Sequence, residues 1–553
     1  MKRTKIFAAI SVISLAVPFA APAQESAKGQ VVLPDVTTTV EGDQVNVADE
    51  ANPDFSNLNP QTLDAKEVLP ELPDSNSSSV GDELSSPGKG GAEKEVYAEG
   101  HLGGGFPGFF TGAFQLYKDS LSNPFTLNFS HLTNNGYGLK TASQGYFTNS
   151  TNFDGKKQIS GKNTDINIQG AFSSSDIGLQ QKSDAFYDIS NQTISSFDTV
   201  EWTFPLGFGL FLSNDLIWYS RYSGIKDEGL SYIPQEAEAS TIYESPYLRA
   251  AWSNSTVSLG LGGGYNFQHL FTSANDPSCL LSIHRGTFGG DFAWNNDIMG
   301  IDAAFNFVVG NTIGSNANFL VPFHLAFSGQ WPVSYASVPL RFTVEGGLKS
   351  ELYLFSQLEK DYSYAKMYEL ATDQSDWYGQ LSAEIPVAQI FTMNAKVLFM
   401  QTAFGNGVWS ADYSAANANN VYEFTQTERT LLDTELSGTF AWSMFDISVD
   451  WKSHWFYVPS NDYQFSVGAA LDVNPDSGLW GAKIEVREAF AANSQDLLPF
   501  VNLSAYYRMT KSMRIALELN DVIKLVTGGE RYYYGSEYNI SAGSAALLLK
   551  FYF

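Results

Sequence analysis

Residues 445–457 read FDISVDWKSHWFY, in which apolar and polar residues alternate. Successive side chains of a β-strand point to opposite faces, so this spacing gives one apolar face and one polar face. The apolar face holds Phe445, Ile447, Val449, Trp451, Trp455 and Tyr457, and the polar face holds Asp446, Ser448, Asp450, Lys452 and His454. The stretch therefore predicts a strand that separates an apolar medium from water.

The same alternation recurs at residues 298–309 and 513–520. The composition agrees with it, since 40 Phe, 28 Tyr, 11 Trp and 47 Gly accompany a hydrophobic content of only 44%. Such a mixture is typical of a porin-like transmembrane wall. After the N-terminal region, no window offers the roughly 18 apolar residues that a membrane-spanning helix needs. Soluble β-sandwiches also alternate, so another feature has to separate the two classes.

The lengths of the connections between the predicted strands distinguish a transmembrane barrel from a soluble β-sandwich. Short connections are predicted at 252–255, 294–297, 386–388, 443–444, 474–477 and 510–511, and long ones at 134–162, 224–243, 355–375, 404–428 and 523–540. Short turns at one end and long loops at the other are the layout of outer-membrane barrels. We therefore expect an all-β fold, a large closed antiparallel barrel of about 22 strands, in the range of roughly 20 to 24.

Tryptophans mark both ends of the predicted strands, as interfacial girdles require. One set lies at short turns and the other at the starts of long loops. The first set is Trp252, Trp294, Trp331 and Trp442, and the second is Trp218, Trp377 and Trp455.

The N-terminal region divides into two parts before the barrel of residues 96–553. Residues 1–23 have the basic start, apolar run and Ala21-Pro22-Ala23 site of a signal peptide. Residues 24–95 hold 15 Asp or Glu against 4 Lys, a composition that predicts a disordered tail in the periplasm of a diderm bacterium.

A proline-acid unit repeats along that tail and suits docking to a periplasmic protein, although a plain solvated spacer would show the same composition. The docking candidates are Leu33, Pro34, Asp35, Pro53, Asp54, Phe55, Pro70 and Pro73. The stretch at 36–40, VTTTV, could add as a strand to such a partner.

Several functions are disfavoured by composition. A net charge of -27 argues against binding nucleic acid. The single Cys279 and six dispersed histidines predict neither a metal site nor a cofactor. No Gly-x-Ser-x-Gly motif occurs, and Asp450 and His454 would lie about 13 Å apart along one strand, so no enzyme is expected.

The C-terminus ends LLLKFYF, and Leu547, Leu549, Phe551 and Phe553 alternate to a terminal Phe. This pattern resembles the signal by which outer-membrane assembly machinery recognises its clients. In addition, Leu519-Asn520-Asp521-Val522, a long loop, and Ser541-Ala542-Gly543 before the last strand resemble the end of TonB-dependent-receptor-type barrels. The resemblance covers the last 35 residues closely and implies an uptake barrel in the outer membrane. The family's globular plug is longer than the segment available here, so the resemblance points to a plugless member.

A barrel of this size encloses more space than its side chains fill, so something has to obstruct it. The sequence offers the loop at 134–162, the acidic tail or a separate protein. Candidates for the polar lining are Asp302, Asp433, Glu435, Asp446, Asp450, Lys452, Arg514 and Glu518, although simple hydration of a polar wall explains them as well.

Two functions fit these features. The first is solute transport, as a channel or as the barrel half of an uptake system with a periplasmic partner, the solute being unknown. The alternative is a surface adhesin or structural outer-membrane protein with long extracellular loops, for which Arg531-Tyr532-Tyr533-Tyr534 would supply contacts.

Overall fold

A computed structural model gives the structure of the protein. It describes residues 96–118, 123–181, 186–225, 233–234, 239–272, 279–296, 298–312, 319–334, 339–362, 365–388, 390–416, 422–458, 463–475, 477–490, 499–532 and 540–553. The signal peptide and tail predicted for residues 1–95, with all the docking candidates, lie outside these ranges.

Twenty-two long strands of the described chain form one antiparallel sheet, to which the two-residue strands β10 (Ile233–Pro234) and β15 (Phe319–Leu320) add. The first eleven are β1 (Tyr97–Phe106), β2 (Phe109–Lys118), β3 (Phe125–Asn134), β6 (Thr148–Ser160), β7 (Thr164–Gly178), β8 (Phe186–Thr203), β9 (Phe208–Ile225), β11 (Ala239–Ser253), β12 (Val257–Thr272), β13 (Ser282–Asn295) and β14 (Met299–Gly310). The others are β16 (Phe323–Trp331), β17 (Leu340–Glu351), β18 (Gln374–Ala388), β19 (Phe391–Thr402), β22 (Thr430–Trp442), β23 (Phe445–Trp455), β24 (Phe465–Val473), β25 (Trp480–Phe490), β26 (Phe500–Thr510), β27 (Met513–Asn520) and β30 (Ser544–Tyr552).

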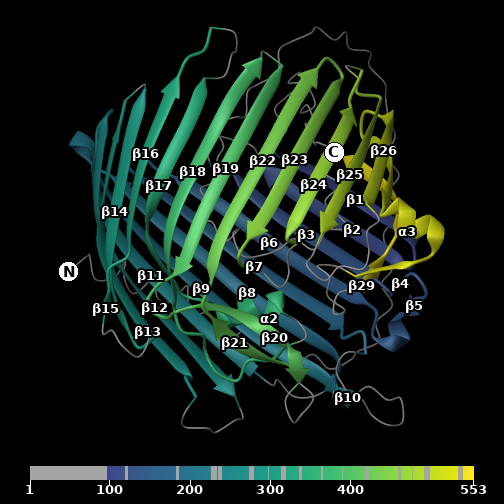
Figure 1. The fold of residues 1–553 in the computed structure, drawn as a ribbon, viewed down its shortest axis with the longest axis horizontal. Helices are drawn as coiled ribbons and strands as arrows, with labels where there is room; N and C mark the ends of the chain where they lie inside the picture. Colours follow the sequence, from purple (N-terminus) through teal and green to yellow (C-terminus); the bar gives the residue numbers. More distant parts are fainter. Residues whose placement is uncertain are drawn as a thin grey trace. The chain divides into compact units, whose positions relative to one another are not determined.

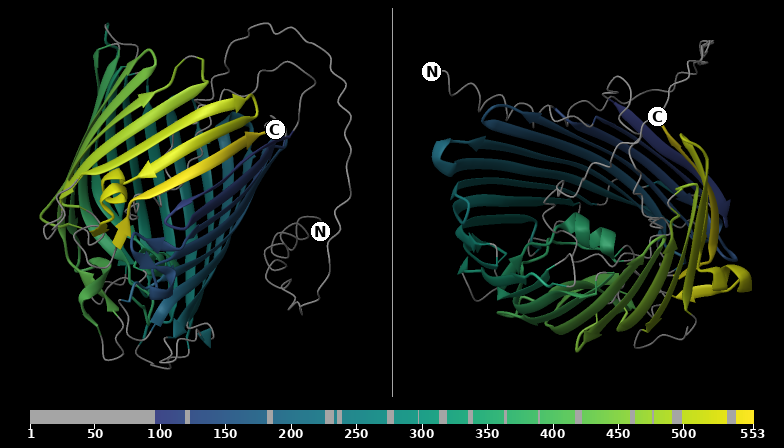
Figure 2. Two further views of the ribbon diagram at one scale, coloured as in Figure 1. Left: turned by 90° about the vertical axis from the view of Figure 1, so that its right-hand side faces the viewer. Right: turned by 90° about the horizontal axis from the view of Figure 1, so that it is seen from above.

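The sheet closes on itself. Each long strand pairs with the next one in the chain, and β1 pairs with β30 from Glu99↔Tyr552 to Phe106↔Ala545. Figures 1 and 2 show the resulting ring of tilted strands. A closed ring leaves no strand edge unpaired, so the backbone can cross lipid. The predicted fold class and the strand number of about 22 are confirmed.

The two ends of the barrel differ as the sequence predicted. β1 begins and β30 ends at the turn end, where the connections after β2, β6, β8, β11, β13, β16, β18, β22, β24 and β26 are short. At the loop end, every connection except Pro107-Gly108 and 179–185 is longer, and 352–373, 403–429 and 521–543 are the longest. In outer-membrane barrels the short turns face the periplasm and the long loops face the exterior.

Shorter elements lie in the connections. They are β4 (Gly136–Tyr137), β5 (Lys140–Thr141), η1 (Ala142–Gln144), η2 (Pro205–Gly207), α2 (Phe355–Asp361), β20 (Val408–Ala416), β21 (Tyr422–Thr427), α3 (Val522–Thr527), β28 (Glu530–Tyr532) and β29 (Ile540–Ala542). Within the described residues, neither α-helix has the length or hydropathy to cross a membrane.

The outer face of the ring is an apolar belt. Its exposed side chains include Leu102, Phe129, Ile168, Phe288, Phe305, Leu325, Val449 and Leu547. Exposed tryptophans bound the belt at both ends, with Trp331, Trp442 and Trp480 at the turn end and Trp218, Trp377 and Trp455 at the loop end. A closed sheet with such a belt is an outer-membrane barrel.

One predicted loop was wrong. Residues 148–160 of the expected loop at 134–162 form β6, which pairs with β3 and β7. Only Phe153 and Ile159 are large apolar residues in this strand, so the alternation is too weak to be recognised. The loop that remains, 135–147, is much shorter, and it is not the element that folds into the barrel.

A smaller error concerns Tyr457, which was expected to face lipid with Trp455. β23 ends at Trp455, and Phe456 has a positive φ of 69°. This turn breaks the alternation, and Tyr457 packs against the buried clusters inside the loop end.

The residues that carry the family resemblance form one structural unit. Asp521 adopts a left-handed conformation and caps α3 by accepting a hydrogen bond from the Lys524 amide. A Cβ at Gly543 would lie 2.1 Å from the Leu525 nitrogen. Only glycine lets the chain pass so close to α3 before it enters β30.

Ring closure generates a prediction about two neighbouring glycines. A Cβ at Gly105 would lie 1.8 Å from the Ala545 oxygen, whereas at Gly104 the nearest atom is the Phe109 oxygen at 3.3 Å. We expect Gly105→Val to disturb the β1–β30 seam and to destabilise the barrel by about 1–3 kcal/mol or more.

Gly104→Val is the matched control and should have a much smaller effect. The measurement is the free energy of unfolding in denaturant from lipid vesicles. Equal losses for the two variants would contradict the seam geometry.

Candidate functional site: a loop folded into the barrel

The connection 352–373, here called the inward loop, lies inside the ring of strands. Viewed from above in Figure 2, its helix α2 sits within the barrel near the wall. Its sequence explains this placement, because Phe355, Leu358 and Tyr362 fall at helical spacing and all three are buried. A loop exposed to water would have no reason to carry them.

An apolar cluster holds the inward loop against the wall. The wall contributes Tyr219, Ala239, Leu270 and Ile283, and the inward loop contributes Tyr353, Phe355, Leu358, Tyr362, Ala365, Met367, Leu370 and Ala371. Val408 and Ala411 come from the connection 403–429, here called the hairpin loop after β20 and β21. Burial of each large side chain contributes about 1.5–3 kcal/mol to the docked state.

The hairpin loop packs on the inward loop directly. The Trp409 indole donates a hydrogen bond to the Thr372 carbonyl at 3.1 Å. The Lys366 amide donates to the Tyr422 carbonyl at 3.0 Å, and the Tyr362 and Phe424 rings meet edge to face. The two loops therefore form one folded unit.

The first of three arginine–carboxylate pairs joins β9 to α2. Arg221 lies 2.8 Å from Glu359, and their side chains are 2% and 1% exposed. Arg221 also donates to the Ala365 carbonyl at 3.0 Å. Glu359 accepts further hydrogen bonds from the Tyr219 hydroxyl at 3.1 Å and the Met367 amide at 3.3 Å.

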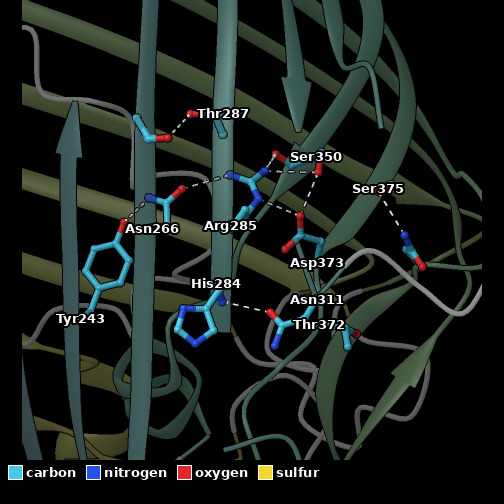
Figure 3. Close-up of polar contacts among 12 residues, drawn as sticks. Tyr243, Asn266, His284, Arg285, Thr287, Asn311, Ser350, Thr372, Asp373 and Ser375 are labelled. Carbon is cyan, nitrogen blue, oxygen red and sulfur yellow. Dashed lines mark hydrogen bonds and ion pairs between the residues drawn. The ribbon is translucent and has the colours of Figure 1, made fainter. Parts of the chain in front are cut away.

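A second pair joins β13 to the end of the inward loop (Figure 3). Arg285 Nε lies 2.9 Å from Asp373, and the same guanidinium donates to the Ser350 carbonyl at 3.2 Å and to Asn266 Oδ1 at 3.4 Å. The Ser350 hydroxyl donates to Asp373 at 3.2 Å. The sticks in Figure 3 converge on this pair from β12, β13 and the end of β17.

The third pair joins the hairpin loop to the wall. Arg429 lies 3.3 Å from Asp376 of β18, and its guanidinium stacks over the Tyr457 ring at 5.7 Å from the ring centre. Gln374 donates to the same carboxylate and accepts from the Tyr353 hydroxyl. Together the three pairs fix the middle and end of the inward loop and the end of the hairpin loop.

Buried pairs of this kind determine geometry more than they add stability. Removing two charges from water costs about as much as their attraction returns, whereas an unpaired buried charge is strongly unfavourable. The docked loops are therefore held in one arrangement, because displacing the inward loop from Arg221 or Arg285 would leave a buried guanidinium without its carboxylate.

A further carboxylate of α2 has no such partner. Both carboxylate oxygens of Asp361 are buried and make no hydrogen bond to the described residues. Burial raises the pKa of Asp361 to about 7, and the neighbouring Lys360 opposes the shift. Burial also lowers the pKa of Lys360.

The predicted lining residues all lie on the inner face by the pairing register, but in separate parts of the wall. Asp302 lies 3.6 Å from His324, Asp433 lies 2.5 Å from His454, and Asp450 lies 3.4 Å from Arg487. Glu435 is opposite Lys452, and Asp446 is opposite Asp472. Arg514 lies over the Tyr506 ring at 4.1 Å, on the same strand as Glu518.

Three of these residues, Glu435, Asp450 and Lys452, share a groove on the inner wall of β17, β18, β19, β22 and β23. Its volume is about 530 Å³, and its charged lining is balanced between Arg341, Lys396 and Lys452 and the acids Glu384, Glu435 and Asp450. The groove offers donors and acceptors of both charges to a solute inside the barrel.

The sequence reasoning missed Arg221, Arg285, Asp373 and Glu359. A signal was present, since the stretch FSQLEKDYSYAKMYELA at 355–371 is too rich in large apolar residues for a solvated loop. The partner arginines carry no such signal, because any inward position of a barrel strand can be charged.

The other predicted residues lie away from this site. Leu547 and Phe553 are exposed on the outer face, and Leu549 and Phe551 share that face. The described part of the chain does not include the side chains of residues 530–541, among them Arg531 and Tyr532. Residues 533–539 lie outside it altogether.

Solved structures with the same fold are transporters and receptors by their titles. The FrpB iron transporter from Neisseria meningitidis (F5-1 variant) matches with a TM-score of 0.61 and 10% identity, over 84% of this chain and 83% of that chain. A mutant ferric enterobactin receptor (PfeA) from Pseudomonas aeruginosa gives 0.57 and 11%, over 84% and 81%. The copper transporter OprC gives 0.59 and 11%, over 83% and 80%.

No protein-family model and no curated protein sequence matches the chain. At this identity the structural matches establish the fold alone, and they confirm the barrel fold that the C-terminal resemblance implied.

The Arg221–Glu359 pair generates a prediction about docking. We expect Arg221→Met to weaken docking of the inward loop by about 3–5 kcal/mol, because Glu359 would remain buried without its countercharge. Trypsin cleavage at Lys360 and Lys366 in the folded barrel is the measurement. Arg341→Met, which removes the more exposed pair with Glu384, is the control and should leave cleavage slow. Arg221→Met/Glu359→Gln should recover part of the protection.

Asp361 generates a prediction about pH. The pKa of Asp361 is raised in the docked loop. Its contribution to the stability of docking is therefore fully present below the ordinary pKa of 3.8, and it is lost as pH rises through about 7. Hydrogen exchange of residues 355–371 should therefore quicken across that window. Asp361→Asn should remove this component, and an unchanged pH profile in that variant would contradict the assignment.

Proposed function

We propose that this protein is an outer-membrane transport barrel whose outer mouth is closed by the inward loop and the hairpin loop. The observation that carries the proposal is the docked inward loop, tied to β9 and β13 of the wall by Arg221–Glu359 and Arg285–Asp373. A structural anchor would need neither an occupied interior nor a polar inner wall.

The balanced lining supports passage of a polar solute. Charges of both signs along β17 to β23 offer exchangeable hydrogen bonds to a hydrated solute, without one dominant field that would hold an ion of either sign. Titles of the structural matches name iron and copper transporters and a ferric enterobactin receptor. We carry over the class of activity, transport across the outer membrane, and not those solutes.

We further propose that the tail of residues 24–95 recruits a periplasmic partner. Such a partner would control passage from the periplasmic side. The repeated proline-acid units support this docking, since each proline holds a short extended segment that a groove or sheet edge can bind.

Conductance in planar bilayers tests the closure. The wild-type barrel should conduct weakly, and replacement of residues 355–371 by a Gly-Ser linker should give larger, defined steps, because it removes the apolar cluster and Glu359 together. Replacement of residues 135–147, a loop that does not join this cluster, is the matched control. Equal conductance in all three proteins would reject the inward loop as the closing element.

Co-purification tests the partner. The full chain, cross-linked in cells and isolated from outer membranes, should retain one periplasmic protein that a chain lacking residues 30–75 loses, while the amount of folded barrel stays the same. A scrambled tail of the same composition separates docking from spacing. If it retains the same protein, the proline-acid units are not the contact.

A further inference from the structure

The outer face of the barrel carries a polar patch in the middle of its apolar belt. Asp198 of β8 and Asn214 of β9 lie directly opposite each other in the sheet. By the pairing register, both side chains lie on the outer face of the barrel. Ile168, Ile194 and Trp218 are exposed on the same face. The inward neighbours of Asp198 and Asn214 are Thr199, which accepts a hydrogen bond from Asn167 inside the barrel, and Ser213.

The patch lies at mid-height in the belt. Along β9, Asn214 sits between Leu212 and Leu216, with exposed aromatic residues Phe208 and Trp218 toward the two ends. Along β8, Asp198 sits between Val200 and Ser196, with Trp202 toward the turn end. Neither side chain can therefore reach an aqueous interface as easily as a residue beside a girdle.

Several other polar residues of the outer face pair with one another across neighbouring strands. His131 bonds to Thr151 at 2.9 Å, His269 to Ser282 at 2.7 Å, and Thr434 to Ser453 at 2.6 Å. Asp198 and Asn214 make no hydrogen bond or ion pair to any described residue, and the Asn214 carbonyl oxygen is buried and unsatisfied. A carboxylate and an amide left unpaired against lipid are unfavourable.

We propose that this patch is the contact between two copies of this chain within the membrane. The patch holds one acceptor and one donor side by side, which makes it complementary to itself. A two-fold axis along the membrane normal, passing between β8 and β9, would place the Asn214 amide of each copy against the Asp198 carboxylate of the other. Leu212, Leu216, Ile194 and Val200 would surround both hydrogen bonds and exclude lipid and water.

A partner of other chemistry fits less well. A basic or purely donating surface would leave the Asn214 amide N–H donor unmatched, and lipid chains offer neither donors nor acceptors. Two identical patches match acceptor to donor twice with no additional component.

The test is the subunit stoichiometry of the full chain in phosphatidylethanolamine–phosphatidylglycerol vesicles, by single-molecule photobleaching at several protein-to-lipid ratios. We expect a dimer whose dissociation constant rises at least about tenfold in Asp198→Leu and in Asn214→Leu. The exchange Asp198→Asn/Asn214→Asp preserves the pairing and should restore the dimer. Glu488→Leu, at an outward acid of β25, is the matched control and should change nothing.

Both leucine variants make the belt more apolar, so the barrel should still fold, and heat-modifiable migration on gels verifies this. A monomeric wild-type protein in vesicles would overturn the proposal, as would leucine variants that dimerise as tightly as wild type. A monomer that cross-links at Leu212→Cys to a different protein in cells, in a Cys279→Ser background, would overturn it in favour of that protein.

Discussion

Every peptide N–H and C=O that enters the hydrocarbon layer needs a hydrogen-bond partner within the protein, because lipid supplies none. The pairing of β1 with β30 meets this requirement at the last open position of the ring. Glycines at the seam let the two backbones approach where a side chain would not fit, as at Gly105. Once the ring is closed, the alternation of each strand has a fixed meaning: one face meets lipid and the other meets the interior.

Closure at this number of strands creates the second requirement, which is to occupy the interior. A ring of about 22 strands is too wide for its own side chains to fill. At the loop end, the inward loop occupies part of this space. Its apolar residues pack against the wall there and are removed from water. The barrel wall in turn supplies Tyr219, Leu270 and Ile283, which are inward positions that a purely hydrated channel would keep polar.

Electrostatics then selects how the loop docks. Apolar packing alone would allow several positions for a helix as short as α2, because it is not directional. Arg221 and Arg285 allow only the position in which Glu359 and Asp373 face them, since each guanidinium is nearly buried. Ion pairs elsewhere on the inner wall are different. Pairs such as Arg341–Glu384 are half-exposed and solvated, so their side chains can exchange partners.

The sequence by itself determined the fold class, the strand number and the arrangement of short turns and long loops, because alternation and turn lengths are local properties of the chain. It failed at β6, where few apolar residues mark the outward face, and at Tyr457, where a positive φ at the preceding residue reversed the alternation. Only the tertiary structure decided which loop occupies the barrel and which arginines hold it. The reason is physical: Arg221 and Glu359 are 138 residues apart, and no local pattern specifies a pairing that closure of the whole ring brings together.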